Sequence, residues 1–163
     1  MKTRKNLNGG SGGSLRTECY DAYANYFVKY IKEYEKKNTN VFAITVQNEP
    51  LYAPEKYPGM LMSSQEQINF IKNHLGPKFK SNDIQTKIIG YDHNYDKSGF
   101  DYALDLLNNA GSYQYISGIG FHTYASPNHQ TMSTLHYLFP NKGFWITEAG
   151  NHYYFYRFDI NVF

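Results

Sequence analysis

The chain has 163 residues, which is the usual size of a single domain with its own hydrophobic core. Its 16 Lys and Arg nearly balance its 14 Asp and Glu, so the charge gives no reason to expect nucleic acid as a partner. The single cysteine, Cys19, excludes an intramolecular disulfide and a cysteine-rich zinc site. No apolar run approaches the roughly 20 residues that cross a bilayer, and no apolar core follows the basic start as in a signal peptide. We therefore expect neither a transmembrane segment nor a signal peptide.

A glycine-rich stretch, residues 6–14, predicts a flexible polar connection, and a helix follows it. Thr17 is a plausible N-cap, and from there apolar residues recur three or four apart. Asn38 is suited to the left-handed position after the last turn. The residues expected on the buried face are Tyr20, Tyr23, Ala24, Phe27, Ile31 and Tyr34.

Residues 41–49 predict a strand that ends in a carboxylate. Phe42, Ile44 and Val46 alternate along one face of it. Pro50 cannot donate a ladder hydrogen bond and biases Glu49 toward an extended conformation, so the strand should stop there. Parallel α/β sheets and barrels keep their chemistry at the carboxyl ends of their strands. The alternative is a buried strand that ends in a surface glutamate before a turn.

Three more helix–strand pairs follow in the sequence. Ser63 and Glu66 form a capping box at the start of a helix that Gly76-Pro77 should end. The remaining predicted elements are strands over residues 86–91, 116–121 and 143–146, a helix over 101–110 stopped by Gly111, and a short helix from Ser126-Pro127 to Pro140. Alternating helices and strands imply right-handed crossovers and a parallel sheet, hence an α/β fold. Four such pairs fit an open doubly wound sheet or part of a closed barrel.

Every predicted strand ends in polar residues. These are Glu49, Asp92-His93-Asn94, His122-Thr123-Tyr124 and Thr147-Glu148. Two carboxyl groups that flank one acetal can split it, because one protonates the leaving oxygen while the other attacks the anomeric carbon or activates water. Glu49 and Glu148 are the candidates, although about 100 residues separate them in the sequence. His122 and Tyr124 follow two glycines on one strand face and would line a pocket; alternatively, His122 is a satisfied core histidine.

Other chemistries lack their motifs. Asp92-His93 could contribute to a metal site, but the sequence has no His-Glu-x-x-His and no ligand pair of diagnostic spacing. It has no Gly-x-Ser-x-Gly elbow and no glycine-rich phosphate fingerprint. We therefore expect no metal and no cofactor.

Six short motifs carry a resemblance to a known family. They are Val46-Gln47-Asn48-Glu49-Pro50-Leu51-Tyr52, Tyr57-Pro58-Gly59-Met60, Leu75-Gly76-Pro77, Asp92-His93-Asn94, His122-Thr123-Tyr124 and Thr147-Glu148-Ala149. In this order they resemble glycoside hydrolase family 30, which includes glucosylceramidases and endo-β-1,6-glucanases. The resemblance covers residues 1–151 and implies a partial (β/α)8 TIM barrel, with about four parallel strands that match barrel strands four to seven and truncation at both ends. Residues 152–163 are a divergent aromatic tail.

The resemblance also implies roles for single residues. Glu49 would be the acid/base and Glu148 the nucleophile of a retaining β-glycosidase. Asn48 would hydrogen-bond the sugar hydroxyl next to the anomeric carbon, and His122 and Tyr124 would bind the sugar beside the nucleophile.

Two interpretations of the chain remain open. The first is a fragment of a glucosylceramidase-like retaining β-glycosidase acting on glucosylceramide; within it, the same motifs fit an endo-β-1,6-glucanase acting on β-glucan. The second is a non-catalytic half-barrel remnant, which the missing strands favour. Open sheet edges predict self-association in either case. Thr123 stands where family members often have Trp, so the pocket wall should differ, and the family implies a lysosomal or secreted location for a full-length protein.

Overall fold

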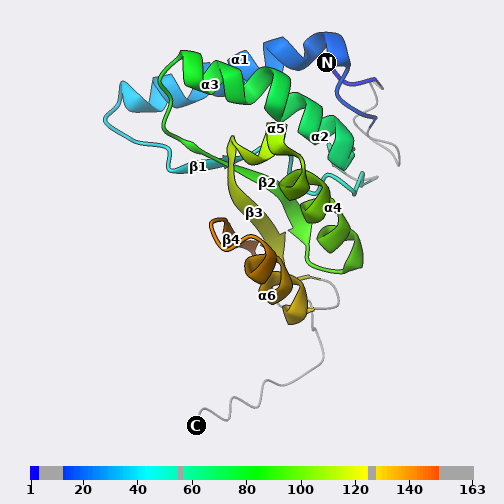
Figure 1. The fold of residues 1–163 in the computed structure, drawn as a ribbon. Coiled ribbons are helices and arrows are strands. Elements are labelled where there is room, and N and C mark those ends of the chain that lie inside the picture. Colours follow the sequence, from blue (N-terminus) through cyan, green and yellow to red (C-terminus); the bar gives the residue numbers. More distant parts are fainter. Residues whose placement is uncertain (4–12, 55–56, 125–127, 151–163) are drawn as a thin grey trace.

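The computed structural model describes residues 1–3, 13–54, 57–124 and 128–150, and its centre is a parallel four-stranded sheet in the order β1-β2-β3-β4. The strands are β1 (Ala43–Thr45), β2 (Lys87–Asn94), β3 (Ile116–His122) and β4 (Gly143–Glu148). Each strand pairs in parallel with the next in the sequence, and helices join them, so the sheet curls into half a barrel (Figure 1). The predicted partial TIM barrel with four parallel strands is confirmed.

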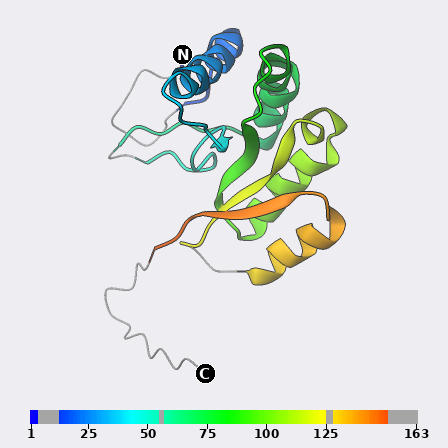
Figure 2. The same ribbon diagram turned by 90° about the vertical axis from the view of Figure 1, so that its left-hand side faces the viewer.

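The helical elements are η1 (Thr17–Cys19), α1 (Tyr20–Glu35), α2 (Ser64–Phe70), η2 (Ile71–Leu75), α3 (Gly76–Ser81), α4 (Lys97–Asn108), α5 (Ala110–Tyr113) and α6 (His129–Leu138). The main core packs helix side chains such as Ile31, Phe70 and Leu106 with the strand residues Ile119 and Phe121, all fully buried. Within the described residues no helix is long and apolar enough to cross a bilayer. Figure 2 shows the carboxyl ends of β3 and β4 side by side, and that end of the sheet carries the site described below.

The first helix follows its predicted pattern with two exceptions. Its expected face is buried at Tyr20, Ala24, Phe27 and Ile31, and half-buried at Tyr23. Tyr34, however, is exposed, because it lies in the last turn beyond the neighbouring core. Thr17 is not an N-cap, since it begins the η1 turn and Arg16 precedes it. Asn38 has the predicted left-handed backbone, with φ of 57°.

The predicted helix end at Gly76-Pro77 is wrong, because the chain stays helical to Ser81. Residues 71–75 form a π turn, and the Gly76 N–H donates to the Ile71 carbonyl five residues earlier. This wider turn accommodates a proline that has no N–H of its own. Gly76 also packs directly on the Tyr115 ring, where a Cβ would lie 2.3 Å from a ring carbon.

Other helix ends are set by side-chain caps. The capping box of Ser63 and Glu66 is confirmed at the start of α2. The next helix starts earlier than predicted, because the Asp96 side chain accepts a hydrogen bond from the Gly99 N–H. Gly111 does not stop that helix; it lies inside the separate short α5. The predicted cap at Ser126-Pro127 lies outside the described residues.

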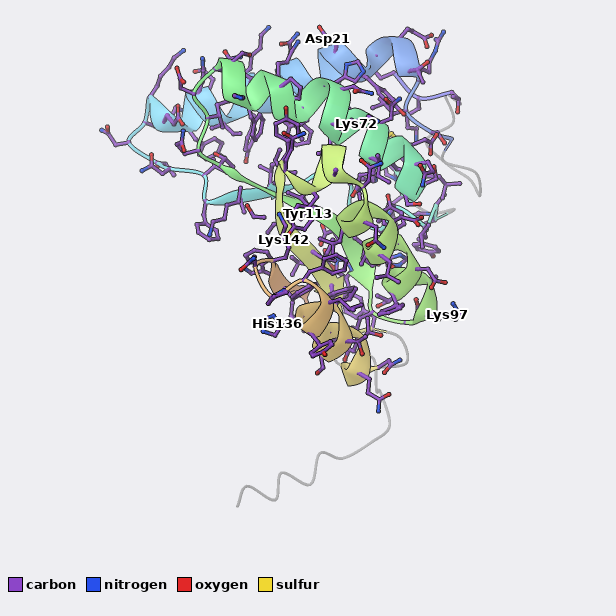
Figure 3. The ribbon with its side chains drawn as sticks, in the orientation of Figure 1. Asp21, Lys72, Lys97, Tyr113, His136 and Lys142 are labelled. Carbon is purple, nitrogen blue, oxygen red and sulfur yellow. The ribbon has the colours of Figure 1, made fainter. Side chains whose placement is uncertain are left out.

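The start of β4 is fixed by a lysine. Lys142 donates 2.7 Å hydrogen bonds to the carbonyls of Tyr113 and Ile116. Its ammonium lies 3.6 Å from the centroid of the Tyr113 ring, in a cation–π contact (Figure 3). Burial lowers the pKa of Lys142. These contacts hold one end of β4 beside β3, and Glu148 stands at the other end.

The strand that should have reached Glu49 is shorter than predicted, and β1 ends at Thr45. Glu49 is not extended: its φ of 47° is left-handed, so the expected effect of Pro50 is wrong. Two main-chain hydrogen bonds outweigh the preference for an extended conformation before Pro50. The Glu49 N–H donates to the Asp92 carbonyl, and the Glu49 carbonyl accepts from the Tyr52 N–H, each at 2.9 Å. The main chain of Glu49 is thereby tied to the tip of β2.

Candidate active site

A pocket of about 380 Å³ opens at the carboxyl ends of the strands. Its lining residues are Asn48, Glu49, Tyr52, Tyr57, Tyr124 and Glu148. The fold therefore brings together four of the predicted site residues, including two carboxylates far apart in the sequence. Tyr52 and Tyr57 were not among the predicted site residues, although both follow Glu49 in a proline-containing loop. Their rings give the mouth of the pocket apolar faces.

The fifth predicted residue, His122, lies beneath this pocket and is fully buried. Its Nδ1 is 3.5 Å from Oε1 of Glu49 and 3.7 Å from Oε2 of Glu148. Its Nε2 is 3.1 Å from Oδ1 of Asp92. One ring thus contacts three carboxylates. Among the described residues, Nδ1 has no hydrogen-bond partner of good geometry.

Asp92 is the buried acid of the site, and sequence reasoning gave it no role there. Its Oδ1 accepts a 2.6 Å hydrogen bond from the hydroxyl of Thr147, and its Oδ2 accepts one of 2.6 Å from Thr45. The backbone is left-handed at Tyr91 and Asp92, with φ of 68° and 86°, where the register between β2 and β3 shifts. A bulge of this kind re-aims a side chain, and here it directs Asp92 toward His122.

The charges of this cluster follow from its contacts. Burial would raise the pKa of Asp92, but hydrogen bonds from His122, Thr147 and Thr45 outweigh burial and lower it. Burial would likewise lower the pKa of His122, but the hydrogen bond and charge of Asp92, then the charges of Glu148 and Glu49, raise it. The geometry favours an ionised Asp92 beside a protonated His122.

The second histidine, His93, is held differently. Its Nε2 is 3.7 Å from Oε1 of Glu49, but burial dominates and lowers the pKa of His93. The nearby charge of Glu49 raises that pKa and does not fully compensate. Glu49 therefore faces one histidine that favours the charged form and one that favours the neutral form.

Tyr124 supplies a donor to the other carboxylate. Its hydroxyl donates a 3.1 Å hydrogen bond to Oε2 of Glu148, and its main-chain N–H donates to Oδ1 of Asn94 at 3.0 Å. Burial first, and then the hydrogen bond to Glu148, raise the pKa of Tyr124. The phenol thus stays protonated and able to donate.

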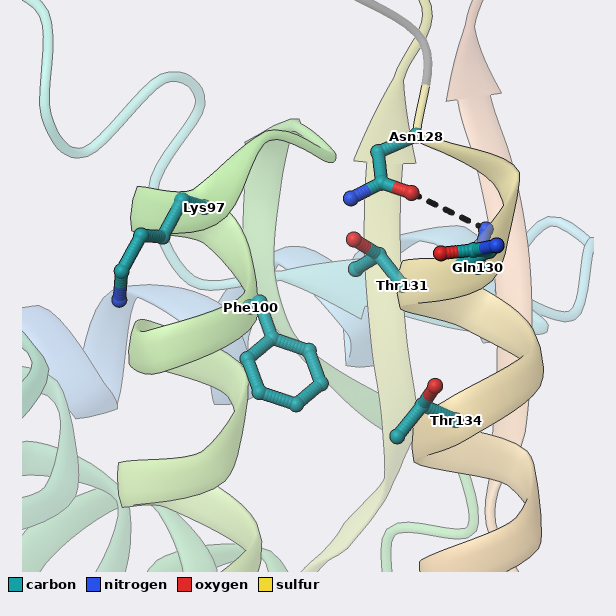
Figure 4. Close-up of a pocket in the computed structure, with 6 residues that line it drawn as sticks. All are labelled: Lys97, Phe100, Asn128, Gln130, Thr131 and Thr134. Carbon is teal, nitrogen blue, oxygen red and sulfur yellow. Dashed lines mark hydrogen bonds between the residues drawn. The ribbon is translucent and has the colours of Figure 1, made fainter.

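A second pocket, of about 300 Å³, lies between α4 and α6 (Figure 4). It is lined by Lys97, Phe100, Asn128, Gln130, Thr131 and Thr134. Among its described lining residues are a lysine, amides and hydroxyls, and none of the paired carboxylates that cleave an acetal. In the described ranges, no group of three His, Cys, Asp or Glu side chains is placed to hold a metal ion.

Comparison with known proteins agrees with this architecture. The profile of the glycosyl hydrolase family 30 TIM-barrel domain matches residues 1–162. An endo-1,6-beta-D-glucanase of Aspergillus fumigatus is 39% identical over 149 residues, covering 88% of this chain and 30% of that protein. The lysosomal acid glucosylceramidase of Mus musculus is 29% identical over 161 residues, covering 91% of this chain and 30% of that protein.

A solved endo-beta1,6-glucanase superposes with a TM-score of 0.74 at 33% identity, covering 81% of this chain and 30% of its own. The chain thus spans about 30% of the length of the relatives it matches. Within that span, the matched profile includes both candidate carboxylates and every described strand. The chain belongs to glycosyl hydrolase family 30.

Proposed function

We propose that this segment supplies the two catalytic carboxylates of a retaining β-glycosidase, with Glu49 as acid/base and Glu148 as nucleophile. The observation that carries the proposal is their meeting at one pocket, where an oxygen of each lies within 3.7 Å of His122 Nδ1. These contacts limit the two oxygens to a separation of about 7 Å or less, which is compatible with the separation of about 5 Å between the carboxyl groups of a retaining enzyme.

The surroundings of the two carboxylates support unequal roles. Glu148 accepts a hydrogen bond from Tyr124, a contact that orients its carboxyl group for attack as a nucleophile. Glu49 instead lies beside His93, whose pKa is lowered, and is held by its own main chain at the tip of β2. A general acid must carry a proton before the first step, so the carboxylate without the phenol donor is the better candidate.

The proposed substrate is a β-linked glucoside. Relatives include a glucosylceramidase and endo-1,6-β-glucanases, and the identity is 39% to the Aspergillus glucanase against 29% to the mouse glucosylceramidase. This difference favours a β-1,6-glucan over glucosylceramide. The exposed rings of Tyr52 and Tyr57 beside Glu49 suit a substrate that extends beyond one sugar.

Catalysis requires a sugar held within a fraction of an ångström, which four strands of a barrel are not expected to achieve. The second candidate function is therefore a non-catalytic half-barrel. In the described part of the chain, Ile146, Thr147 and Glu148 are exposed along β4.

The experiment joins residues 1–150 to the remaining barrel strands of the Aspergillus relative and assays an aryl β-glucoside with a good leaving group, a β-1,6-gluco-oligosaccharide and glucosylceramide. Glu148→Gln should abolish turnover of all three. Glu49→Gln should spare the first step with the aryl glucoside, because that leaving group needs little protonation. Glu33→Gln, on the exposed face of α1, is the matched control. An equal loss on every substrate for both variants would contradict the assignment, and an inactive parent fusion would favour the remnant.

A further inference from the structure

The side chain of Asp92 lies one layer below the pocket. It is buried and absent from the pocket lining, yet four strands contribute to its surroundings. Hydroxyls from β1 and β4 donate to its two oxygens, and His122 of β3 donates to one of them. A buried carboxylate with this many donors is held ionised and in one orientation.

The His122 ring lies above Asp92. Its Nε2 faces Asp92, and its Nδ1 faces the pocket carboxylates Glu49 and Glu148. With Nε2–H donating to Asp92, a bare Nδ1 would point its lone pair at two carboxylate oxygens whenever Glu49 and Glu148 are both ionised, which is repulsive. A protonated Nδ1–H would point a positive charge at both, which is attractive. No other described hydrogen bond competes for Nδ1.

We propose that His122 is an imidazolium at neutral pH that Glu49 and Glu148 share, and that Asp92 is the positioning residue that orients this ring and keeps it charged. The reaction role rests on the proposed function, whereas the charge state of His122 can be tested without it. Asp92 is not among the residues that line the pocket, and it acts through His122.

This arrangement suits a double displacement. In the first step the bond from the anomeric carbon to the leaving oxygen breaks, Glu148 bonds to that carbon, and the proton of Glu49 moves to the leaving oxygen. The negative charge thereby passes from Glu148 to Glu49. In the second step water attacks the carbon, its proton goes to Glu49, and Glu148 leaves with the charge restored. Because His122 faces both oxygens, its charge compensates whichever carboxylate is ionised, without moving.

Other groups around the ring do not supply that charge. The His93 ring packs edge-on with centroids 6.0 Å apart, and its pKa is lowered by burial. The Tyr124 ring packs edge-on at 5.7 Å and directs its hydroxyl to Glu148. The described charged groups facing His122 are therefore three carboxylates and no cation.

The test is the protonation of His122, measured by ring ¹⁵N NMR of the 163-residue chain labelled at histidine. Wild-type His122 should carry protons on both nitrogens at neutral pH and lose one at a higher pH than the exposed His136. Asp92→Asn, which keeps the size of the side chain, should move that loss to lower pH. Asp101→Asn, an exposed acid on α4, is the matched control and should change nothing.

Asp92→Asn also removes a buried charge and could fail to fold. Glu148→Gln is therefore the second variant, since its site is exposed and the substitution keeps the shape. It too should lower the pH at which His122 loses its proton. The proposal is overturned if His122 loses its proton over the same pH range as His136. It is also overturned if both variants fold and neither changes the pH at which His122 loses its proton. Neither result depends on hydrolysis, so failure here is distinguishable from failure of the proposed function.

Discussion

Thr147 of β4 reaches across β3 to donate a 2.6 Å hydrogen bond to Asp92 of β2. The residue between them is Gly120, where a Cβ would lie 3.0 Å from Cγ2 of Thr147 and 3.2 Å from Cγ2 of Ile89. The absence of a side chain at Gly120 is what leaves Thr147 room to reach the buried acid.

Gly120→Ala should therefore destabilise the protein by about 1–3 kcal/mol, because the added methyl would press on Thr147 and on the buried Ile89. The added methyl would push Thr147 away and weaken its hydrogen bond to Asp92. Urea unfolding would measure the loss, with Ser117→Ala on the same strand as the control. Thr147→Ser keeps the hydroxyl and removes the methyl that clashes, so the double variant should recover part of the loss. Strictly additive effects would show that Thr147 and Gly120 do not share this space.

Gly76 makes a second close contact, with the Tyr115 ring behind the π turn. Gly76→Ala should lower the free energy of unfolding by about 1–3 kcal/mol, because its Cβ would lie 2.3 Å from a ring carbon of Tyr115. Combining Tyr115→Leu with Gly76→Ala should reduce this loss of unfolding free energy. A thermal unfolding midpoint unchanged in the single variant would contradict the packing.

Periodicity and strand order predicted the fold because they depend on local patterns. Alternating strands and amphipathic helices give a parallel sheet wherever crossovers are right-handed, and the polar ends of its strands then meet at one edge. The pairing of Glu49 with Glu148 at a single pocket follows from that rule.

Features set by tertiary contacts were missed. The left-handed Glu49 depends on a main-chain hydrogen bond to Asp92, which overrides the local preference of a residue before proline. Asp92 gains its position from a bulge in β2, and no sequence pattern marks that bulge. The close packing of Gly76 after the π turn likewise involves Tyr115, which lies far along the chain.

The two histidines beside Glu49, of which His122 is buried and His93 half-buried, should make stability depend on pH in opposite directions. The pKa of His122 is raised on folding, so its contribution is present below its unfolded value of about 6.5 and is lost as pH rises through its folded pKa. The pKa of His93 is lowered, so its contribution is present above about 6.5 and is lost as pH falls toward its folded pKa.

His93→Gln removes the second effect and leaves the first. The free energy of unfolding of the variant minus that of wild type should therefore be more favourable to the variant at about pH 5 than at about pH 8. Urea unfolding at both values would measure the difference, and His136→Gln, exposed on α6, is the control. A variant with the same pH dependence as wild type would mean that His93 is not buried in its neutral form.

The last prediction concerns association of the chain as it stands. In the described part of the sheet, β1 and β4 each have one neighbouring strand, so each presents an unpaired edge. The β4 edge is the longer, with six residues against three. Its Ile146 pairs in register with the fully buried Phe121, yet is 47% exposed. An apolar strand with a free edge is a template for pairing with a second chain.

We expect the 163-residue chain to self-associate with increasing concentration, which sedimentation velocity would measure. Ile146→Lys should shift the distribution toward monomer, because a lysine on an edge strand repels its copy and must stay solvated. Phe42→Lys, beside the short β1 edge, distinguishes the two edges, since Phe42 is also exposed but precedes only three paired residues. If β4 is the contact, Ile146→Lys disperses the chain and Phe42→Lys does not. The reverse result would assign association to β1, and a wild-type chain that stays monomeric at every concentration would show that neither edge pairs.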